Sequence, residues 1–260
     1  MDAAGVAAAL RESGGVRVVA GGTKLGWGRP IEAPELSVSE LDAIVEHNEG
    51  DLTAILQAGV PLARARAAFA EAGQMLALDP PDEGSTIGGV IATGDSGPLR
   101  HRYGGPRDLV LGVQVALPDG SLARAGSKVI KNVAGYDLAK LMTGAYGTLG
   151  VVTEVSVRLH PAPRDRLTVV VRRDEPRALA QAAADLTHRP LEAERLDLRW
   201  EDGAGAVFAQ LTGPSAPERA ASIDGEVVAD DEELWAAQRA AQRGPVVLRV
   251  STTQEGLVDV

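Results

Sequence analysis

Three glycine-rich segments hold the residues whose types and spacing could do chemistry. The first, 20–28, reads Ala-Gly-Gly-Thr-Lys-Leu-Gly-Trp-Gly and follows a predicted strand. Glycines let several consecutive backbone N–H groups point into one concavity, as binding of a diphosphate requires. The spacing matches neither the dinucleotide-binding fingerprint nor the P-loop, so a simple turn remains the alternative interpretation.

The second segment, 79–94, reads Asp-Pro-Pro-Asp-Glu-Gly-Ser-Thr-Ile-Gly-Gly-Val-Ile-Ala-Thr-Gly. Its prolines fix an extended approach, and the small residues after them could lie flat against an aromatic ring. The alternative is a long surface loop, but Ile87, Val90 and Ile91 fit it poorly, because loops with apolar anchors are usually packed. The third segment joins 131–138, Lys-Asn-Val-Ala-Gly-Tyr-Asp-Leu, to 147–154, Gly-Thr-Leu-Gly-Val-Val-Thr-Glu.

Strands and short helices must position these segments. Periodicity and turn residues predict a helix over 3–12, a strand over 16–20, a hairpin over 43–58, a helix over 61–73, a hairpin over 110–125 and an alternating strand over 151–159. Pro161-Ala162-Pro163 is the best candidate for a domain boundary. Beyond it, strands over 167–171, 195–200, 206–211 and 246–250 and helices over 176–186 and 231–243 predict a small α+β sandwich.

Composition limits the function classes. The 260 residues are 45% hydrophobic and 24% charged, which is ordinary for a globular protein. The net charge of −10 without a basic block argues against a nucleic-acid partner. Without cysteine the chain cannot hold a thiolate zinc site or a cysteine-bound iron–sulfur cluster. No apolar run approaches the roughly 20 residues of a transmembrane segment, and the N-terminus lacks a basic export signal, so we expect a cytoplasmic location.

Taken together, the three segments resemble the FAD-binding domain shared by vanillyl-alcohol oxidase, D-lactate dehydrogenase and glycolate oxidase. Gly-Tyr-Asp-Leu followed by Gly-Thr-Leu-Gly-Val-Val-Thr indicates the 2-hydroxyacid branch. The variant at 131–137, with Ser96-Gly97-Pro98 and Arg102-Tyr103-Gly104, is most similar to the FAD-binding subunit of glycolate oxidase. The resemblance covers roughly residues 15–163 and implies FAD as cofactor.

The resemblance also implies roles for individual residues. The pyrophosphate would be wrapped, mainly by backbone N–H groups, by Gly21, Gly22, Thr23, Lys24 and Leu25. The flavin and its ribityl chain would lie along Pro80, Gly84, Ser85, Thr86, Gly88 and Gly89. The adenine side would be closed by Gly147, Gly150, Val151 and Val152. Lys131, Asn132 and Tyr136 would lie nearer the isoalloxazine, with Lys131 as the candidate cation beside the reduced flavin.

Histidines and arginines complete the list of candidates. Some family members attach FAD through a histidine beside the pyrophosphate loop, but this loop has Thr23 and Lys24 there, so we expect non-covalent FAD. The four histidines lack metal-site spacing, so we expect no metal. Arg100 could bind a substrate carboxylate through its guanidinium, as could Arg102. The alternative is a basic loop that balances an acidic protein or contacts another subunit. Lys131, Tyr136 and Arg100 are therefore the catalytic candidates.

We expect an α+β fold with a two-part FAD-binding domain over 1–163: a small α/β lobe and a larger mixed or antiparallel sheet lobe. A small α+β cap would follow over 164–260, either reduced or part of a longer protein. The implied function is oxidation of a short 2-hydroxyacid, glycolate or D-lactate, with electrons passed to a second flavoprotein subunit and an iron–sulfur subunit. Through these partners the chain could be peripheral to the inner membrane. The alternatives are a non-catalytic FAD-binding scaffold and NADPH-dependent reduction of an enolpyruvyl sugar.

Overall fold

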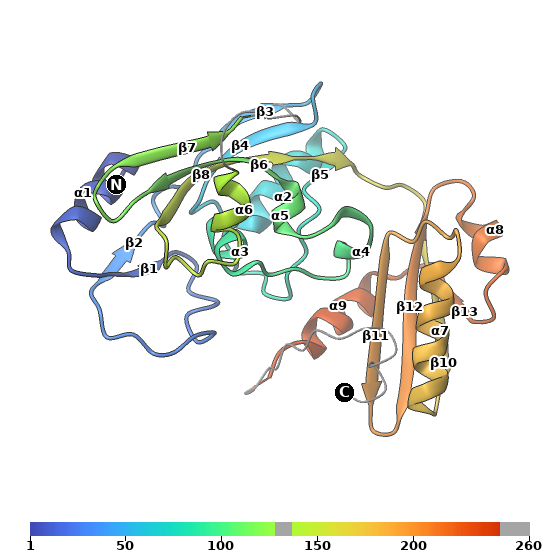
Figure 1. The fold of residues 1–260 in the computed structure, drawn as a ribbon. Helices are drawn as coiled ribbons and strands as arrows, with labels where there is room; N and C mark the ends of the chain where they lie inside the picture. The colour runs from blue at the N-terminus through green and yellow to red at the C-terminus, as the bar shows by residue number, and fades with distance from the viewer. Residues whose placement is uncertain (128–136, 245–260) are drawn as a thin grey trace. The chain divides into compact units, whose positions relative to one another are not determined.

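The computed structural model describes residues 1–127 and 137–244 of the chain. These residues form two compact units (Figure 1). The first comprises Met1–Ser96 and Tyr103–Ala162, and the second comprises Gly97–Arg102 together with the residues from Pro163 onward. Each unit is built around its own antiparallel sheet.

The first unit is organised by a five-stranded antiparallel sheet with the order β3-β4-β8-β6-β7. Its strands are β3 (Ile44–Asn48), β4 (Thr53–Gln57), β6 (Val110–Ala116), β7 (Leu122–Gly126) and β8 (Val151–Arg158). Both predicted hairpins are confirmed, since β3 pairs with β4 and β6 with β7. The long alternating strand β8 lies between the two hairpins and joins them into one sheet.

A small α/β part precedes this sheet. Helix α1 (Ala3–Glu12) begins at Asp2, whose side chain accepts a hydrogen bond from the Gly5 N–H. Strands β1 (Arg17–Val19) and β2 (Glu35–Ser37) pair in parallel. Buried side chains from α1, the β2 region and the sheet form one apolar cluster, which comprises Val6, Ala7, Leu36, Val38, Leu41, Ala116 and Val151. This cluster fixes the end of β1, from which the first glycine loop leaves.

Short helices pack beneath the sheet in the view of Figure 1. Besides α1, the described part of this unit contains α2 (Leu62–Glu71), α3 (Ile87–Thr93), α5 (Pro106–Leu109) and α6 (Leu138–Met142). A minor pair of strands is formed by β5 (Gln74–Met75) and β9 (His160–Pro161). Phe69, Ile87 and Ile91 are at most 1% exposed, so α2 and α3 are part of the core. α4 (Arg100–Tyr103) lies where the chain returns from the second unit.

The second unit is a four-stranded antiparallel sheet with helices on both faces. Its strands, in the order β11-β12-β10-β13, are β10 (Arg166–Arg173), β11 (Arg195–Glu201), β12 (Ala204–Thr212) and β13 (Glu226–Val228). Odd-numbered residues of β10 and β12 pack against α7 (Pro176–His188) and α8 (Ala216–Ala221). Even-numbered residues, including Val170 and Phe208, pack against Trp235 of α9 (Glu232–Ala241). This alternation follows from the two-residue period of a strand.

A buried polar network joins α9 to this sheet. Asp231 precedes α9 and is 2% exposed. Its Oδ2 accepts hydrogen bonds from Thr168 Oγ1 at 2.8 Å and from Gln210 Nε2 at 2.6 Å. Arg166 Nε lies 3.4 Å from its Oδ1, and Trp235 Nε1 donates to Thr168 Oγ1 at 2.9 Å. The carboxylate is therefore held by groups on two strands, and α9 is fixed by polar as well as apolar contacts.

The expected α+β fold is confirmed, and most predicted helices and strands are present within a few residues. The main difference is α3: the sequence predicts an extended approach at the two prolines and no helix after it, and the structure has a helix at Ile87–Thr93. Glycine disfavours helix, but here Thr86 caps the helix and its apolar residues are buried. The short elements β2, β5, β9, β13, α4, α5, α6 and α8 were not predicted. The strand expected over 246–250 lies outside the described residues.

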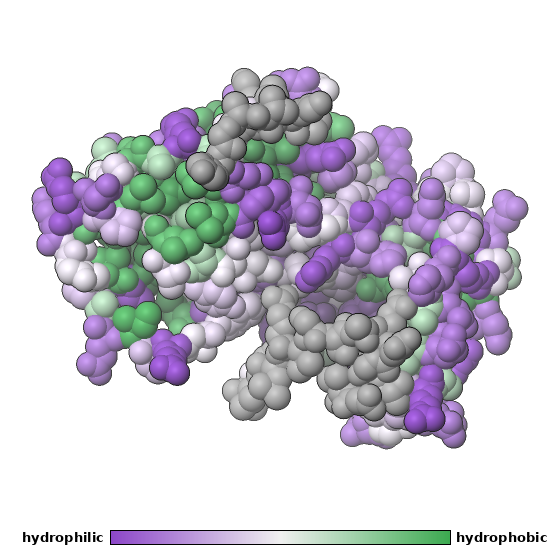
Figure 2. Space-filling view, in the orientation of Figure 1, coloured by the Kyte–Doolittle hydropathy of each residue, from purple (hydrophilic) through white to green (hydrophobic). Residues whose placement is uncertain are grey.

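Exposed apolar side chains are concentrated in the first unit, as the green areas in Figure 2 show. Of the large hydrophobic side chains that are exposed, only Trp200 and Val227 belong to the second unit among the residues described. Leu25, Trp27 and Ile31 follow one another in the loop between β1 and β2. Over the described ranges, no helix has the length and apolar character to cross a membrane. Nor do the described His, Asp and Glu residues form a group that could hold a metal ion.

Candidate functional site

The first glycine loop, 20–28, follows directly after β1. Within 1–127 and 137–244, none of the five backbone N–H groups of residues 21–25 donates a hydrogen bond. Gly22 has φ +73°, a left-handed conformation that glycine adopts without strain. The Trp27 N–H donates to the Lys24 carbonyl at 3.1 Å and closes the turn. The result is a run of free N–H groups of the kind that binds anionic oxygens.

The second segment approaches through buried Pro80 and then forms the start of α3. Thr86 caps this helix, and its Oγ1 accepts a hydrogen bond from the Gly89 N–H at 3.3 Å. The Gly88 N–H donates to the Ala58 carbonyl at 2.7 Å. A Cβ at Gly88 would lie 2.7 Å from the Cβ of Ala58, so close packing of α3 requires glycine there. Gly88 thus has a structural reason for its identity, independent of any ligand.

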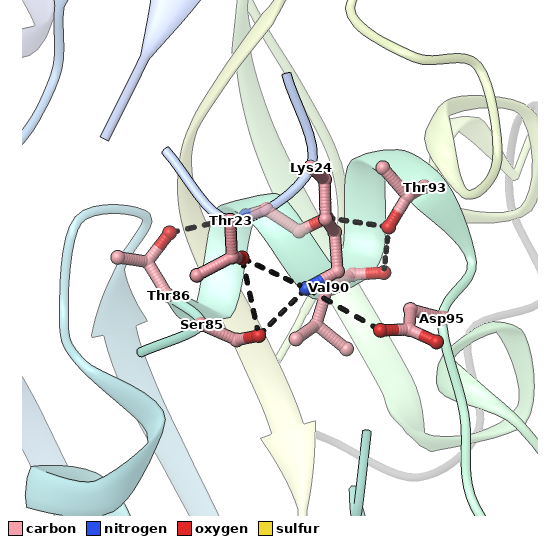
Figure 3. A network of polar contacts seen from close by, with 8 residues as sticks. Thr23, Lys24, Ser85, Thr86, Val90, Thr93 and Asp95 are labelled. Atoms are coloured by element: carbon pink, nitrogen blue, oxygen red, sulfur yellow. Dashed lines mark hydrogen bonds and ion pairs between the residues drawn. The ribbon is translucent and has the colours of Figure 1, made fainter. Parts of the chain in front are cut away.

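These two segments, about sixty residues apart in sequence, lie against each other (Figure 3). A Cβ at Gly21 would lie 2.4 Å from the carbonyl oxygen of Gly84, so only glycine permits this approach. Thr23 Oγ1 and Ser85 Oγ are 3.4 Å apart. The structure therefore brings together the residues that the sequence assigned to the pyrophosphate and to the ribityl chain.

Lys24 turns its side chain inward from this exposed loop. Its Nζ lies 2.6 Å from Ser85 Oγ, 3.1 Å from Thr23 Oγ1 and 3.3 Å from Asp95 Oδ2 (Figure 3). The Lys24 and Asp95 side chains are only 6% and 3% exposed. Sequence reasoning missed Asp95, since an aspartate between Gly94 and Ser96 also suits an ordinary turn. Its burial and its partner depend on the tertiary structure.

The third segment joins the opposite end of α3. The Gly144 N–H donates to the Ile91 carbonyl at 3.0 Å, and the Tyr146 N–H donates to the Ala92 carbonyl at 2.7 Å. Gly147 has φ +74°, which allows the chain to turn toward β8. A Cβ at Gly150 would lie 2.8 Å from the Ala116 carbonyl oxygen. α3 therefore contacts the first glycine loop at its beginning and the third segment at its end.

Val151 and Val152 begin β8 and are 3% and 7% exposed. Val151 belongs to the apolar cluster beneath α1, so its side chain is committed to the core. Because both side chains are buried, a ligand contact of these two residues would involve the main chain. The contacts of Val151 and Val152 with a cofactor stay predictions.

The catalytic candidates are not joined to these loops by the described geometry. Lys131 and Tyr136, together with the cofactor candidate Asn132, lie outside the described residues. Arg100 is exposed and belongs to the second unit, whereas the three glycine segments belong to the first. In the next residue, burial and the adjacent Arg102 lower the pKa of His101 from its ordinary value. Arg102 itself pairs with Glu194, with Nε and Oε2 3.5 Å apart.

The first-unit loops fit the phosphate-bearing part of a dinucleotide. The free N–H groups of 21–25 supply donors, and the hydroxyls of Thr23 and Ser85 lie beside them. The Gly21–Gly84 contact keeps the surface at this point free of side-chain bulk. Backbone donors can hold an anion on a protein whose net charge is −10, because the attraction is local. The donor set is thus suited to the diphosphate of FAD.

Comparison with known proteins supports this reading. Residues 3–126 match the FAD binding domain family. The chain is 38% identical over 194 residues to the glycolate oxidase subunit GlcE of Escherichia coli, which covers 70% of this chain and 54% of the relative. It is 38% identical over 152 residues to the glycolate oxidase subunit GlcD of Bacillus subtilis, covering 58% of this chain and 32% of the relative. A D-lactate dehydrogenase of Saccharomyces cerevisiae is 32% identical over 158 residues, covering 61% and 27%.

The chain thus spans about half the length of GlcE and about a third or less of the other two relatives. Among solved structures, two crystal forms of alkyldihydroxyacetonephosphate synthase match with TM-scores of 0.69 and 0.70 at 18% identity. They cover 86% and 90% of this chain and 49% and 54% of that protein. At this identity the likeness concerns the fold. Residues 3–126 are thus similar to the FAD binding domain family, and the chain is similar in sequence to glycolate oxidase subunits and to a D-lactate dehydrogenase.

Proposed function

We propose that the chain is the FAD-binding part of an oxidoreductase that oxidises a short 2-hydroxyacid of the glycolate or D-lactate type. The observation that carries the proposal is the run of free backbone N–H groups at 21–25, packed against the Gly84–Ser85 segment. The names of the relatives support the substrate class. We assign the cofactor role to residues 1–163 and a partial cap to residues 164–260.

Different residues of the chain would bind the cofactor and orient the substrate. The N–H groups of residues 21–25 would hold the diphosphate, while Ser85 and Thr86 would lie along the ribityl chain. The main chain of Gly147, Gly150 and Val152 would border the adenine. When bound, FAD supplies a hydride acceptor at N5 for the hydrogen at the substrate C2. Removal of the hydroxyl proton needs a base, for which the sequence names no residue. Lys131 would be the cation beside the reduced flavin, Tyr136 would lie near the isoalloxazine, and Arg100 is a candidate partner for the substrate carboxylate.

Electrons would leave through partner subunits. The chain contains no cysteine to hold a cluster of its own. The resemblance to glycolate oxidase implies that a second flavoprotein and an iron–sulfur subunit would receive the electrons. The naming of the relatives as subunits supports an assembly of this kind. We place the chain in the cytoplasm, or at the inner membrane through such partners.

A non-catalytic, FAD-binding scaffold is the second candidate function. It is favoured by one observation: Lys24 and Asp95, the buried charged pair at the loops, are engaged with each other. Neither is therefore poised to accept a proton from a substrate. In this case a partner subunit would perform the oxidation.

The test is an absorbance spectrum of the purified protein before and after anaerobic addition of glycolate and D-lactate. Flavin bands near ~450 nm that bleach would support the 2-hydroxyacid oxidoreductase, and bands that persist would favour the scaffold. Titration of the flavin-free protein with FAD and with FMN tests the contribution of the AMP half of FAD, because FMN lacks the second phosphate and the adenosine. We expect FAD to bind at least about 10-fold more tightly. Failure to bind either flavin would overturn the proposal.

A further inference from the structure

Lys24 occupies an unusual position for a lysine in an exposed glycine loop. Its neighbours Gly22 and Leu25 are exposed, yet its own side chain is 6% exposed. Its ammonium has three N–H donors, and three oxygens surround it, those of Ser85, Thr23 and Asp95. The ring of Trp27 lies 5.5 Å from Nζ and covers it further. These contacts fill the donors of the ammonium before any ligand is considered.

Asp95 is held in place by the end of α3. Gly94 has φ +65° and ends the helix in the left-handed conformation. The Gly94 N–H donates to the Ile91 carbonyl at 3.1 Å, and the Asp95 N–H donates to the Val90 carbonyl at 3.1 Å. This pair of bonds is the Schellman arrangement, which fixes the direction of the next residue. The carboxylate is therefore presented to Lys24 by a rigid helix end.

We propose that Asp95 is a positioning residue for cofactor binding. Through Lys24 it ties the loop at 21–25 to Ser85 and to the end of α3, so that the free N–H groups are already arranged when the diphosphate arrives. An ordered site loses less conformational entropy on binding and so binds more tightly. The inference rests on the proposed FAD-binding function and assigns the Lys24 side chain to loop geometry rather than to phosphate contact.

The physical basis is the asymmetry of a buried ion pair. Both charges are almost entirely removed from water, so loss of either partner takes away a charge that stabilises the other in a poorly solvated place. Without the Asp95 carboxylate, the Lys24 ammonium then moves toward water and takes its loop with it. Loss of both charges removes this driving force. The two single changes should therefore each disturb the loop more than the double change does.

The experiment compares Lys24→Met, Asp95→Asn and the double variant by FAD titration of the full chain. Each single variant is expected to raise the Kd for FAD about 10-fold or more, and the double variant to recover part of that loss. The matched control is Asp42→Asn, which breaks the exposed pair of Arg64 Nη1 and Asp42 Oδ2 at 3.1 Å and should change the Kd less than about 2-fold. If Asp95→Asn binds FAD as tightly as the unchanged protein, or more tightly, the proposal is wrong and the Lys24 ammonium serves the phosphate.

A second measurement needs no cofactor. Trypsin cleaves after Lys24 only when that side chain is accessible, so Asp95→Asn should speed cleavage there about 10-fold, measured by mass spectrometry of the flavin-free chain. An unchanged cleavage rate would overturn the positioning role, whether or not the protein binds FAD. Failure of the unsubstituted protein to bind FAD would overturn only the proposed function. If Asp95→Asn does not fold, Ser85→Ala removes one oxygen from Lys24 without unpairing a charge. This change should raise both the Kd for FAD and the rate of cleavage after Lys24. If either quantity stays unchanged, the proposal is contradicted.

Discussion

Asp95 in the first unit and Asp231 in the second are both 2% exposed, but they are held in different ways. Asp231 meets Thr168, Gln210 and Arg166, which stand on regular strands. Asp95 pairs with Lys24, which comes from a loop outside the helices and strands. The carboxylate of the second unit fastens a helix to a sheet, whereas that of the first fastens one loop to a helix end. A buried carboxylate can thus stabilise a whole unit when its partners lie on the strands of a sheet, or the shape of one loop when its partner lies in that loop.

The largest expected effect comes from removing the carboxylate of the second unit. Asp231→Ala leaves the Thr168 hydroxyl and the Gln210 amide without their shared acceptor in a buried place, so we expect the free energy of unfolding to fall by about 3 kcal/mol. Urea unfolding followed by Trp235 fluorescence, in a variant with Trp27 and Trp200 changed to Phe, measures it. Asp230→Ala, at the exposed neighbouring position, is the control. A loss below about 1 kcal/mol would show that the apolar contacts of α9 suffice.

A smaller loss in the free energy of unfolding is expected from a change at the contact between the loops at 21–25 and 84–89 in the first unit. Gly21→Ala places a Cβ 2.4 Å from the Gly84 carbonyl oxygen, so the loops must separate. We expect a loss of about 1–2 kcal/mol in the free energy of unfolding of the first unit, together with weaker FAD binding. Gly28→Ala, whose Cβ would meet nothing within 4 Å, controls for glycine replacement in the same loop. Equal behaviour of the two variants would mean that the contact at Gly21 has no influence on the loop.

The smallest effect concerns a third acid, Asp197, on the α9 face of the second sheet. Burial raises its pKa, while hydrogen bonds from the Leu198 N–H and Gln238 Nε2 act in the opposite direction. A raised pKa in the folded state means that ionised Asp197 opposes folding. The stability that protonated Asp197 contributes is fully present below the ordinary pKa of about 4. It is lost as the pH rises through the raised pKa that Asp197 has in the folded state.

Asp197→Asn should therefore be more stable than the unchanged protein at neutral pH, and the difference should vanish in acid. Each unit of difference between the pKa of Asp197 in the folded and in the unfolded state changes the free energy of unfolding by about 1.4 kcal/mol. Urea unfolding between pH 3 and pH 7 measures the difference. A variant less stable than the unchanged protein at pH 7 would show that the hydrogen bonds of the carboxylate outweigh its burial.

The sequence predicted those parts of the fold that are set by local patterns. Asn48-Glu49-Gly50-Asp51 and Pro118-Asp119-Gly120 specify turns, and both hairpins form around them. The alternation of residues 151–158 predicts β8 in full. α3 was not predicted, because Gly88 and Gly89 lower helix propensity and the helix depends on the Thr86 cap and on burial of Ile87 and Ile91.

The candidate site was predictable only in part, for a similar reason. Glycine content identified the loops at 21–25 and 84–89, and the structure brings them together. The sequence contains no local signal that Lys24 is buried or that Asp95 is its partner, because both facts arise from packing between segments about seventy residues apart. The roles of the individual cofactor residues stay predictions, including those of Lys131, Asn132 and Tyr136, which lie outside the described residues.

The segment 97–102 has a consequence for how such proteins can be recombined. It belongs to the second unit, where Arg102 Nη1 donates to the Glu192 carbonyl at 3.1 Å, although the residues on either side of it belong to the first. The chain therefore passes between the units three times, at 96/97, 102/103 and 162/163. No single crossover point in the gene could exchange one unit for that of a relative without leaving a mismatched piece behind. Chimeras would have to transfer the short insert together with the C-terminal part.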